Sequence, residues 1–135
     1  MPEIQIRPAV PSDIPVLMDI EHDYKSNYVW QMDLGVEEGQ VDIHFREVRL
    51  PRQVRVDYPR SVQSLRENWT TRSAILVGVF EGEAVGYICL DERLAPSTVW
   101  VTDLAVSEGY RRKGIASGLV LAAQDWGRER NHRRI

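Results

Sequence analysis

The chain has 135 residues and a formal net charge of −3; 43% of its residues are hydrophobic and 27% are charged. This length suits one domain with its own core, and we expect residues 1–135 to form it. No stretch approaches the roughly 18 consecutive apolar residues that a membrane-spanning helix needs, the start lacks the pattern of a signal peptide, and the single Cys89 fits a reducing compartment, so we expect a cytoplasmic protein.

The segment before Val41 contains one clear strand and one helix signal. Ile4 and Ile6, separated by a polar residue, predict a short first strand. Ser12 stands where an N-cap would, and apolar residues follow it at helical spacing. The stretch from Tyr24 to Gln40, with three aromatic residues and two glycines, is interpreted as a helix end and a loop.

The middle of the chain is rich in predicted strands. Val41, Ile43 and Phe45 alternate with polar residues and indicate a strand, and a second extended stretch covers residues 54–58 after Pro51. Residues 61–69 could form a short helix. Two apolar runs, 74–80 and 84–90, flank Glu81-Gly82-Glu83 and predict a hairpin.

The last third predicts a strand, a turn and a helix. Residues 99–106 form the strand, and apolar residues recur through the helix at positions 115, 119, 122 and 126. Gly118 interrupts this pattern and would permit close packing on the sheet. The order of elements predicts an α/β (α+β) fold with a largely antiparallel sheet flanked by helices.

Charge is distributed unevenly along the chain. Residues 111–135 hold seven Lys or Arg against two acidic residues, whereas residues 1–110 hold ten basic and eighteen acidic side chains. This asymmetry predicts a polyanionic ligand near the end of the chain and a cationic ligand earlier. Solvated helix faces are the alternative for the acidic part.

The segment between the last strand and helix has the features of a phosphate site. Helix first turns present unpaired N–H groups and a partial positive charge. Gly114 and Ala116 leave the backbone accessible, and Arg111, Arg112 and Lys113 add positive charge beside it. A diphosphate is the ligand that suits this arrangement best.

Two common nucleotide motifs do not fit the segment. A Walker loop needs Lys and then Ser or Thr after its second glycine, but Ile115 and Ala116 follow Gly114. The G-x-G-x-x-G dinucleotide motif is absent. Arg111-x-x-Gly114-x-Ala116, preceded by Leu104-Ala105-Val106 at the end of a strand, instead resembles the signature of the GNAT (GCN5-related) N-acetyltransferase superfamily. The resemblance is most specific over residues 99–130.

The resemblance implies acetyl-CoA as cosubstrate and transfer of its acetyl group to a primary amine. The fourth strand would carry a bulge, and the free backbone groups beyond it would pair with the pantetheine arm. The implied cofactor-binding residues are Leu104, Ala105, Val106, Arg111, Arg112, Lys113, Gly114, Ile115 and Ala116. Small cationic amines, antibiotics and peptide or protein amines are all possible acceptors, and the acidic excess before Arg111 favours a small cationic one.

The chain departs from the family pattern at two places. Many relatives carry a catalytic glutamate at the position of Thr102, whose hydroxyl is no base at neutral pH. Asp103 is the nearest carboxylate and the candidate catalytic residue, although strand alternation would place it on the opposite face from Thr102. His132-Arg133-Arg134-Ile135 resembles the start of a fifth strand, so we expect a truncated chain or a partner chain that completes the sheet.

The remaining residue types point to no further site. The three histidines and Cys89 lack metal-ligand spacing, so no metal is expected. The aromatic residues Tyr24, Tyr28 and Trp30 could form an acceptor pocket, but packing is the preferred interpretation. The leading hypothesis is therefore an acetyl-CoA-dependent N-acetyltransferase that forms a homodimer. A catalytically inactive acyl-CoA-binding or dimerisation module is the alternative, and nucleic-acid binding is disfavoured by the net negative charge.

Overall fold

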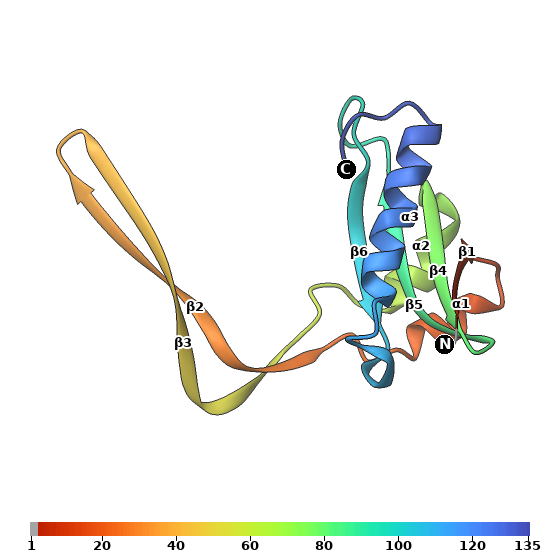
Figure 1. Ribbon diagram of the computed structural model, residues 1–135, viewed down its shortest axis with the longest axis horizontal. Helices are drawn as coiled ribbons and strands as arrows, with labels where there is room; N and C mark the ends of the chain where they lie inside the picture. Colours follow the sequence, from red (N-terminus) through yellow and green to blue (C-terminus); the bar gives the residue numbers. More distant parts are fainter. Residues whose placement is uncertain (1–2) are drawn as a thin grey trace. The chain divides into compact units, whose positions relative to one another are not determined.

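A computed structural model describes residues 3–135 and separates the chain into two compact units (Figure 1). The core unit combines the segment that ends at His22 with Pro59–Ile135, and the hairpin unit covers Asp23–Tyr58. None of the helices in the described residues is both long and apolar enough to cross a membrane.

The core unit is built on a four-stranded sheet. Its strands are β1 (Ile4–Pro8), β4 (Ala74–Phe80), β5 (Glu83–Asp91) and β6 (Trp100–Val106), in the order β1-β4-β5-β6. All neighbouring strands pair antiparallel. The predicted hairpin over 74–90 is confirmed, because β4 and β5 are adjacent and joined at Glu81-Gly82.

Three helices flank this sheet: α1 (Asp13–Met18), α2 (Gln63–Asn68) and α3 (Ile115–Glu129). Short 3-10 turns follow α2 at Trp69–Thr71 and precede α3 at Glu108–Tyr110. The antiparallel α+β architecture predicted from the order of elements is thus confirmed.

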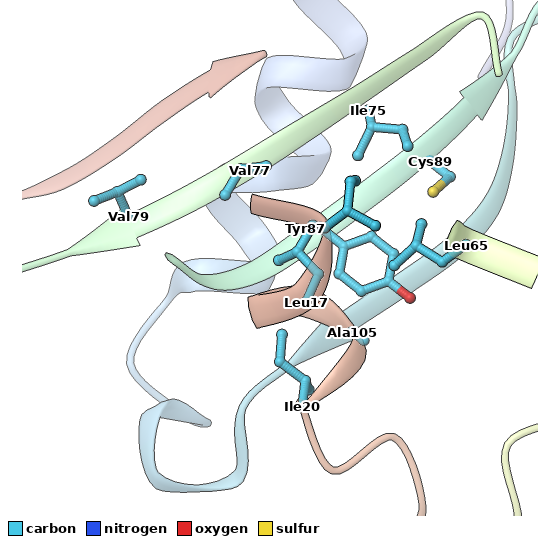
Figure 2. Close-up of a cluster of buried hydrophobic side chains, with 10 residues drawn as sticks. Leu17, Ile20, Leu65, Ile75, Val77, Val79, Tyr87, Cys89 and Ala105 are labelled. Atoms are coloured by element: carbon cyan, nitrogen blue, oxygen red, sulfur yellow. The ribbon is translucent and has the colours of Figure 1, made fainter. Parts of the chain in front are cut away.

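Two buried clusters lie against the sheet. The first joins α1 and α2 to the strands and includes Leu17, Leu65, Tyr87 and Cys89 (Figure 2). The second joins α3 to the strands through Ile115 and Leu119, together with other residues. The two clusters form because residues of one strand alternate between the faces of the sheet: Tyr87 and Cys89 belong to the first cluster, and Ile88 and Leu90 to the second.

The start of α3 lies very close to the sheet. A Cβ atom at Gly118 would lie 3.3 Å from Cδ1 of Ile6 on β1. This distance is tighter than ordinary van der Waals contact, so the glycine permits the close packing that the sequence predicted. Glycine destabilises a helix by about 1 kcal/mol relative to alanine. The close contact with β1 explains why a glycine stands inside α3 at this position.

The hairpin unit consists of two long antiparallel strands, β2 (Tyr24–Glu37) and β3 (Gln40–Val56). They run in register from Glu37↔Gln40 at the tip to Tyr28↔Arg49, and then the register shifts between Ser26 and Tyr28. Residues 50–53 therefore lie opposite Asn27 alone. Pro51 falls within this irregularity, where its missing N–H costs no regular ladder hydrogen bond.

The expectation of a helix end and loop over residues 24–40 is wrong, because residues 24–37 form a strand. The apolar residues Tyr28, Trp30, Met32, Leu34 and Val36 alternate with period two, and Glu38-Gly39 supplies the two-residue turn, with Gly39 at φ 74°. Within the hairpin unit Tyr24, Tyr28 and Trp30 are exposed, so the expected packing of these aromatic residues does not occur against other residues of this unit.

Candidate functional site

A β-bulge lies in the middle of β6. Val101 is paired with Leu90 and Asp103 with Cys89, so Thr102 is an extra residue with no partner on β5. Bulges bend a strand and change the direction of its side chains. Beyond the bulge the strand continues through Leu104, which is partly exposed, to Ala105 and Val106.

The outer edge of β6 is open over most of its length. β6 is the last strand in the order of the sheet, and among residues 3–135 its side of the sheet is met by one isolated parallel bridge, between Thr98 and Arg134. Val99 N–H also donates to the Arg134 carbonyl oxygen at 2.9 Å. Arg134 therefore lies beside Thr98 and Val99, just before β6, and the described residues form no bridge to the outer edge at Leu104–Val106.

The turn between β6 and α3 contains two residues with left-handed backbone. Arg112 has φ 64° and Gly114 has φ 87°. Glycine adopts this conformation without strain, whereas for arginine it is uncommon. A Cβ atom at Gly114 would have no heavy atom within 4 Å, so the backbone here faces open space.

The N-terminus of α3 is available to a ligand. Gly114 is the N-cap, and no side chain caps the helix. The first N–H groups of any helix lack intrahelical acceptors, and the helix dipole adds partial positive charge there. This end of the 15-residue helix therefore has the features of an anion site. A cavity at the same place supports this interpretation.

A cavity of about 630 Å³ lies between the end of β6, the turn and the start of α3. This volume is within the roughly 300–1,000 Å³ of sites for small molecules and cofactors. The lining contains eight of the nine residues predicted to bind the cofactor: Leu104, Ala105, Val106, Arg111, Arg112, Gly114, Ile115 and Ala116. Lys113 is exposed and does not line the cavity, whereas Tyr110 and Ser117 line it without having been predicted.

Arg111 holds the turn in place by hydrogen bonds to backbone. Its Nε donates to the Val106 carbonyl oxygen at 2.9 Å, and its Nη2 donates to the Glu21 carbonyl oxygen at 2.6 Å. The guanidinium therefore connects the end of β6 to the segment after α1. Arg112 and Lys113, in contrast, have no ion pair or side-chain hydrogen bond within the described residues, so their charges are available to an anion.

Asp103 lies in an ion-pair cluster outside this cavity. Its Oδ2 accepts from Nη1 of Arg60 at 3.1 Å and from Nη1 of Arg72 at 3.0 Å, and Asp103 is only 7% exposed. The same Arg72 nitrogen donates to the Thr102 hydroxyl at 3.1 Å. The expectation that Thr102 and Asp103 point to opposite faces is thus wrong, because the bulge interrupts strand alternation at Thr102.

His22 and Tyr87 form a hydrogen-bonded pair that the sequence did not reveal. His22 Nδ1 lies 2.7 Å from the Ile20 carbonyl oxygen, and Nε2 lies 2.8 Å from the Tyr87 hydroxyl. A carbonyl oxygen only accepts, so Nδ1 carries a proton and donates it to the Ile20 carbonyl oxygen, and Nε2 faces the Tyr87 hydroxyl. Tyr87 is the β5 partner of Ala105, which lines the cavity. The two residues are 65 positions apart in the sequence, so no local signal revealed their contact.

Cys89 and the acidic and histidine side chains form no further reactive site within the described residues. Burial raises the pKa of the Cys89 thiol to about 12, with a further contribution from the Asp103 charge, and Cys89 is fully buried. No group of three or more His, Cys, Asp or Glu side chains suited to a metal ion occurs within residues 3–135. The cavity itself presents the end of β6, Arg111, Arg112 and the start of α3.

Comparison with known proteins gives a consistent result. Residues 43–135 match the model of the acetyltransferase (GNAT) family. Nourseothricin acetyltransferase has a similar structure, with 18% identity and a TM-score of 0.74 over 96% of this chain and 69% of that one. A Bacillus anthracis str. Ames protein assigned as a streptothricin acetyltransferase, solved with acetyl coenzyme A, has 17% identity and a TM-score of 0.67 over 96% and 68%.

A third similar structure is a GNAT family N-acetyltransferase of Escherichia coli in complex with CoA, with 18% identity and a TM-score of 0.59 over 98% of this chain and 60% of that one. No curated protein gives a significant match. At these identities the structural similarities establish the fold, and the chain spans between 60% and 69% of the three structures.

Proposed function

The chain belongs to the acetyltransferase (GNAT) family, and on that premise we propose that it is an N-acetyltransferase that moves the acetyl group of acetyl-CoA to a primary amine. The observation that carries the proposal is the cavity at the junction of β6 and α3, which most of the predicted cofactor residues line. Similar structures that contain acetyl coenzyme A or CoA support the choice of ligand.

The proposed binding mode divides the coenzyme between two parts of the cavity. The diphosphate would lie at the N-terminus of α3, where the first-turn amides, Arg112 and the exposed Lys113 provide positive charge. Arg111 would act through the turn, since two backbone carbonyl oxygens already engage its guanidinium. The pantetheine arm would pair with the open edge of β6 beside Leu104, Ala105 and Val106, as an added strand does.

The reaction needs a group that accepts the amine proton. The amine nitrogen would attack the thioester carbonyl carbon and lose one proton to the accepting group. The carbon–sulfur bond would then break, and the CoA thiolate would take up one proton to leave as the free thiol. Asp103 is the candidate from the sequence, but its Oδ2 already accepts hydrogen bonds from Arg60 and Arg72. His22 is a second candidate, because its imidazole is hydrogen-bonded to Tyr87, whose β5 position is paired with Ala105.

We favour a small cationic acceptor among the possible amines. Residues 1–110 hold eighteen acidic against ten basic side chains, and this excess attracts a cation. Two of the similar structures are described as acetyltransferases of nourseothricin and streptothricin. The proposal includes a homodimer, and a cytoplasmic location that is consistent with a single buried thiol.

One observation favours an alternative, an inactive module that binds acyl-CoA without turnover. Thr102 stands where many relatives carry the catalytic glutamate, and the adjacent Asp103 is occupied by two arginines. The two functions differ in a direct assay. An enzyme releases the free thiol of CoA when it is mixed with acetyl-CoA and a suitable amine, whereas a module binds acetyl-CoA and releases no thiol.

The test is therefore thiol release across a panel of amines, with acetyl-CoA binding measured in parallel. The panel should include a streptothricin-type antibiotic, a polyamine, an aminoglycoside and a peptide amine. Amine-dependent thiol release with binding supports the enzyme. Binding without release by any amine would replace the enzyme by the inactive module, and absence of binding would contradict both.

A further inference from the structure

The hairpin unit has one apolar and one polar face. Because neighbours in an antiparallel register share a face, the pairs Trp30↔Glu47, Met32↔Phe45, Leu34↔Ile43 and Val36↔Val41 place seven apolar side chains on one side, with Tyr28 at the base. We call these the apolar face: Tyr28, Trp30, Met32, Leu34, Val36, Val41, Ile43 and Phe45.

The opposite face is hydrophilic from Gln31 to the tip, beyond the Val29↔Val48 pair. Asp33 is paired with His44, Gly35 with Asp42, and Gln31 with Arg46. Arg46 donates to Gln31 at 3.2 Å and forms an ion pair with Asp33 at 3.2 Å. The hairpin is therefore amphipathic over its whole distal half, and a one-residue step along either strand changes the face from apolar to polar.

The apolar face is large and uncovered within the hairpin unit. Exposure of its side chains ranges from 47% at Tyr28 to 69% at Val36, with Trp30 at 68% and Phe45 at 64%. An aromatic side chain buries roughly 150–250 Å², so the three aromatic and five non-aromatic residues of this face, each about half to two-thirds exposed, together offer on the order of 800 Å². The largest exposed apolar patch on a typical monomer covers roughly 300–600 Å². The area of the apolar face is larger than that.

A two-stranded hairpin with this composition needs a partner. An isolated hairpin is at best marginally stable in water and becomes stable when its apolar face packs on another element. A standard protein interface buries about 800 Å² on each partner, which is the area that the apolar face offers. The area therefore matches a complete interface rather than a minor contact.

We propose that the apolar face is a homodimer interface in which the hairpins of two copies of this chain pack face to face. This names the surface of the homodimer in the proposed function and does not depend on acetyl transfer. A surface that meets itself about a two-fold axis must be self-complementary. The eight residues are all uncharged, so the two copies bring no like charges together. The remaining two positions on this side of β3, Glu47 and Arg49, have opposite signs and lie at one end.

The charges at that end select the relative direction of the hairpins. A two-fold axis parallel to the strands would place β3 of one copy over β2 of the other and bury the Glu47 charge against Trp30, which is unfavourable. A two-fold axis that crosses the strands between the Met32↔Phe45 and Leu34↔Ile43 pairs places β2 on β2, so that Trp30 of one copy meets Val36 of the other. Glu47 then lies at the end of the interface, and Arg49 lies beyond it. Met32 and Phe45 then lie near the two-fold axis, with sheets about 10 Å apart as in other face-to-face packings.

Adjacent residues of β3 provide a matched test, because they lie on opposite faces. Phe45→Glu places a charge in the centre of the apolar face, and His44→Glu places the same charge on the polar face. In sedimentation equilibrium the unchanged chain and His44→Glu are expected to have the mass of two chains, and Phe45→Glu that of one. A monomeric unchanged chain at all concentrations, or a dimer that persists in Phe45→Glu, would overturn the proposal.

A cross-linking experiment keeps the test decisive if Phe45→Glu fails to fold. Cys89 is buried, so an introduced cysteine is the accessible thiol of the chain. Met32→Cys, near the proposed axis, should be joined into a dimer by a thiol cross-linker whose spacer of about 10 Å matches the separation of packed sheets, and the neighbouring Asp33→Cys on the polar face should not. Equal cross-linking of the two variants, or none in Met32→Cys, would show that this face does not join two copies.

Discussion

The Nε of Arg111 donates to the carbonyl oxygen of Val106 at 2.9 Å and closes the turn between β6 and α3. The same side chain reaches the Glu21 carbonyl oxygen at 2.6 Å. The first arginine of the signature is thus engaged by the protein itself, whereas the next cation, Arg112, is exposed and unpaired within the described residues. Two adjacent arginines are expected to contribute to coenzyme binding in different ways.

Replacing each arginine by alanine should separate these contributions. Arg111→Ala removes two charge-assisted hydrogen bonds, so the free energy of unfolding without ligand should fall by about 2 kcal/mol. Arg112→Ala should leave that free energy within about 0.5 kcal/mol and weaken acetyl-CoA binding in a salt-dependent manner. Urea unfolding and calorimetric titration at two salt concentrations measure both effects. Equal loss of stability in the two variants would contradict the assignment.

The cluster around Asp103 should be important for stability. Asp103→Asn leaves Arg60 and Arg72 without their shared carboxylate, and breaking a buried pair of this kind should cost about 3 kcal/mol in unfolding free energy. Asp125→Asn is the matched control, because the Asp125–Arg128 pair is exposed on both sides and should contribute less than about 0.5 kcal/mol. A loss as small as the control's would show that the cluster is not structural.

The same variant tests the catalytic hypothesis for Asp103. If Asp103 also accepts the amine proton, kcat of the folded variant should fall by a factor of about 10²–10⁴. His22→Gln is the comparison, because it removes the second candidate base and retains a polar side chain. The larger loss of kcat, at unchanged acetyl-CoA affinity, identifies the proton acceptor. Full activity in both variants would exclude the two residues.

Glu92 should make stability depend on acidic pH. Hydrogen bonds from Arg130 and His132 lower the pKa of Glu92 from 4.5 to about 2. Between these values the unfolded chain binds the proton and the folded chain does not, so this stabilisation is complete above pH 4.5 and is lost as the pH falls towards 2. Glu92→Gln should therefore be less stable than the unchanged chain at pH 7 but not near pH 2. Urea unfolding at several pH values should show this convergence, and a constant difference would refute it.

Cys89 should be unreactive in the folded protein. Burial raises the pKa of its thiol to about 12, and the thiolate is the reactive form. Modification by a thiol reagent at pH 8 should be at least about 100-fold slower in the folded chain than in denaturant. The measurement also validates the thiol-release assay, whose signal would then come from CoA. A rate close to that of a free cysteine would show that the strand around Cys89 opens readily.

The parts predicted best are those whose signals are local. The helix over residues 115–129 follows from apolar residues spaced at one helical period, and the hairpin over 74–90 from two apolar runs around a glycine turn. The cofactor loop also depends on neighbours in sequence, Arg111 to Ala116, and the cavity lies at these residues.

The parts missed depend on contacts that are distant in sequence or on an interrupted pattern. Apolar residues alternate from Tyr28 to Val36, as in a strand, but the aromatic residues and glycines of this segment favoured the interpretation as a loop. Because of the bulge at Thr102, the side chains of Thr102 and Asp103 both contact Arg72, although neighbouring residues of a regular strand point to opposite faces. The pairing of His22 with Tyr87 and of Arg111 with Glu21 joins residues at least 65 positions apart, which no short motif can reveal.

Two glycines provide the most direct test of the coenzyme site. Gly114 and Gly82 both have left-handed backbone, at φ 87° and 81°, and a Cβ atom at either would meet nothing within 4 Å. Tryptophan at each position therefore causes a similar backbone strain, but Gly114 lines the cavity and Gly82 lies in the β4–β5 turn, outside the cavity lining.

Calorimetric titration with acetyl-CoA should be carried out on the unchanged chain, Gly114→Trp and Gly82→Trp. Binding is expected in the unchanged chain and in Gly82→Trp, and should be at least about 100-fold weaker in Gly114→Trp, roughly 2.7 kcal/mol. Binding that survives in Gly114→Trp, or an unchanged chain that does not respond to millimolar acetyl-CoA, would contradict the assignment of this cavity to the coenzyme.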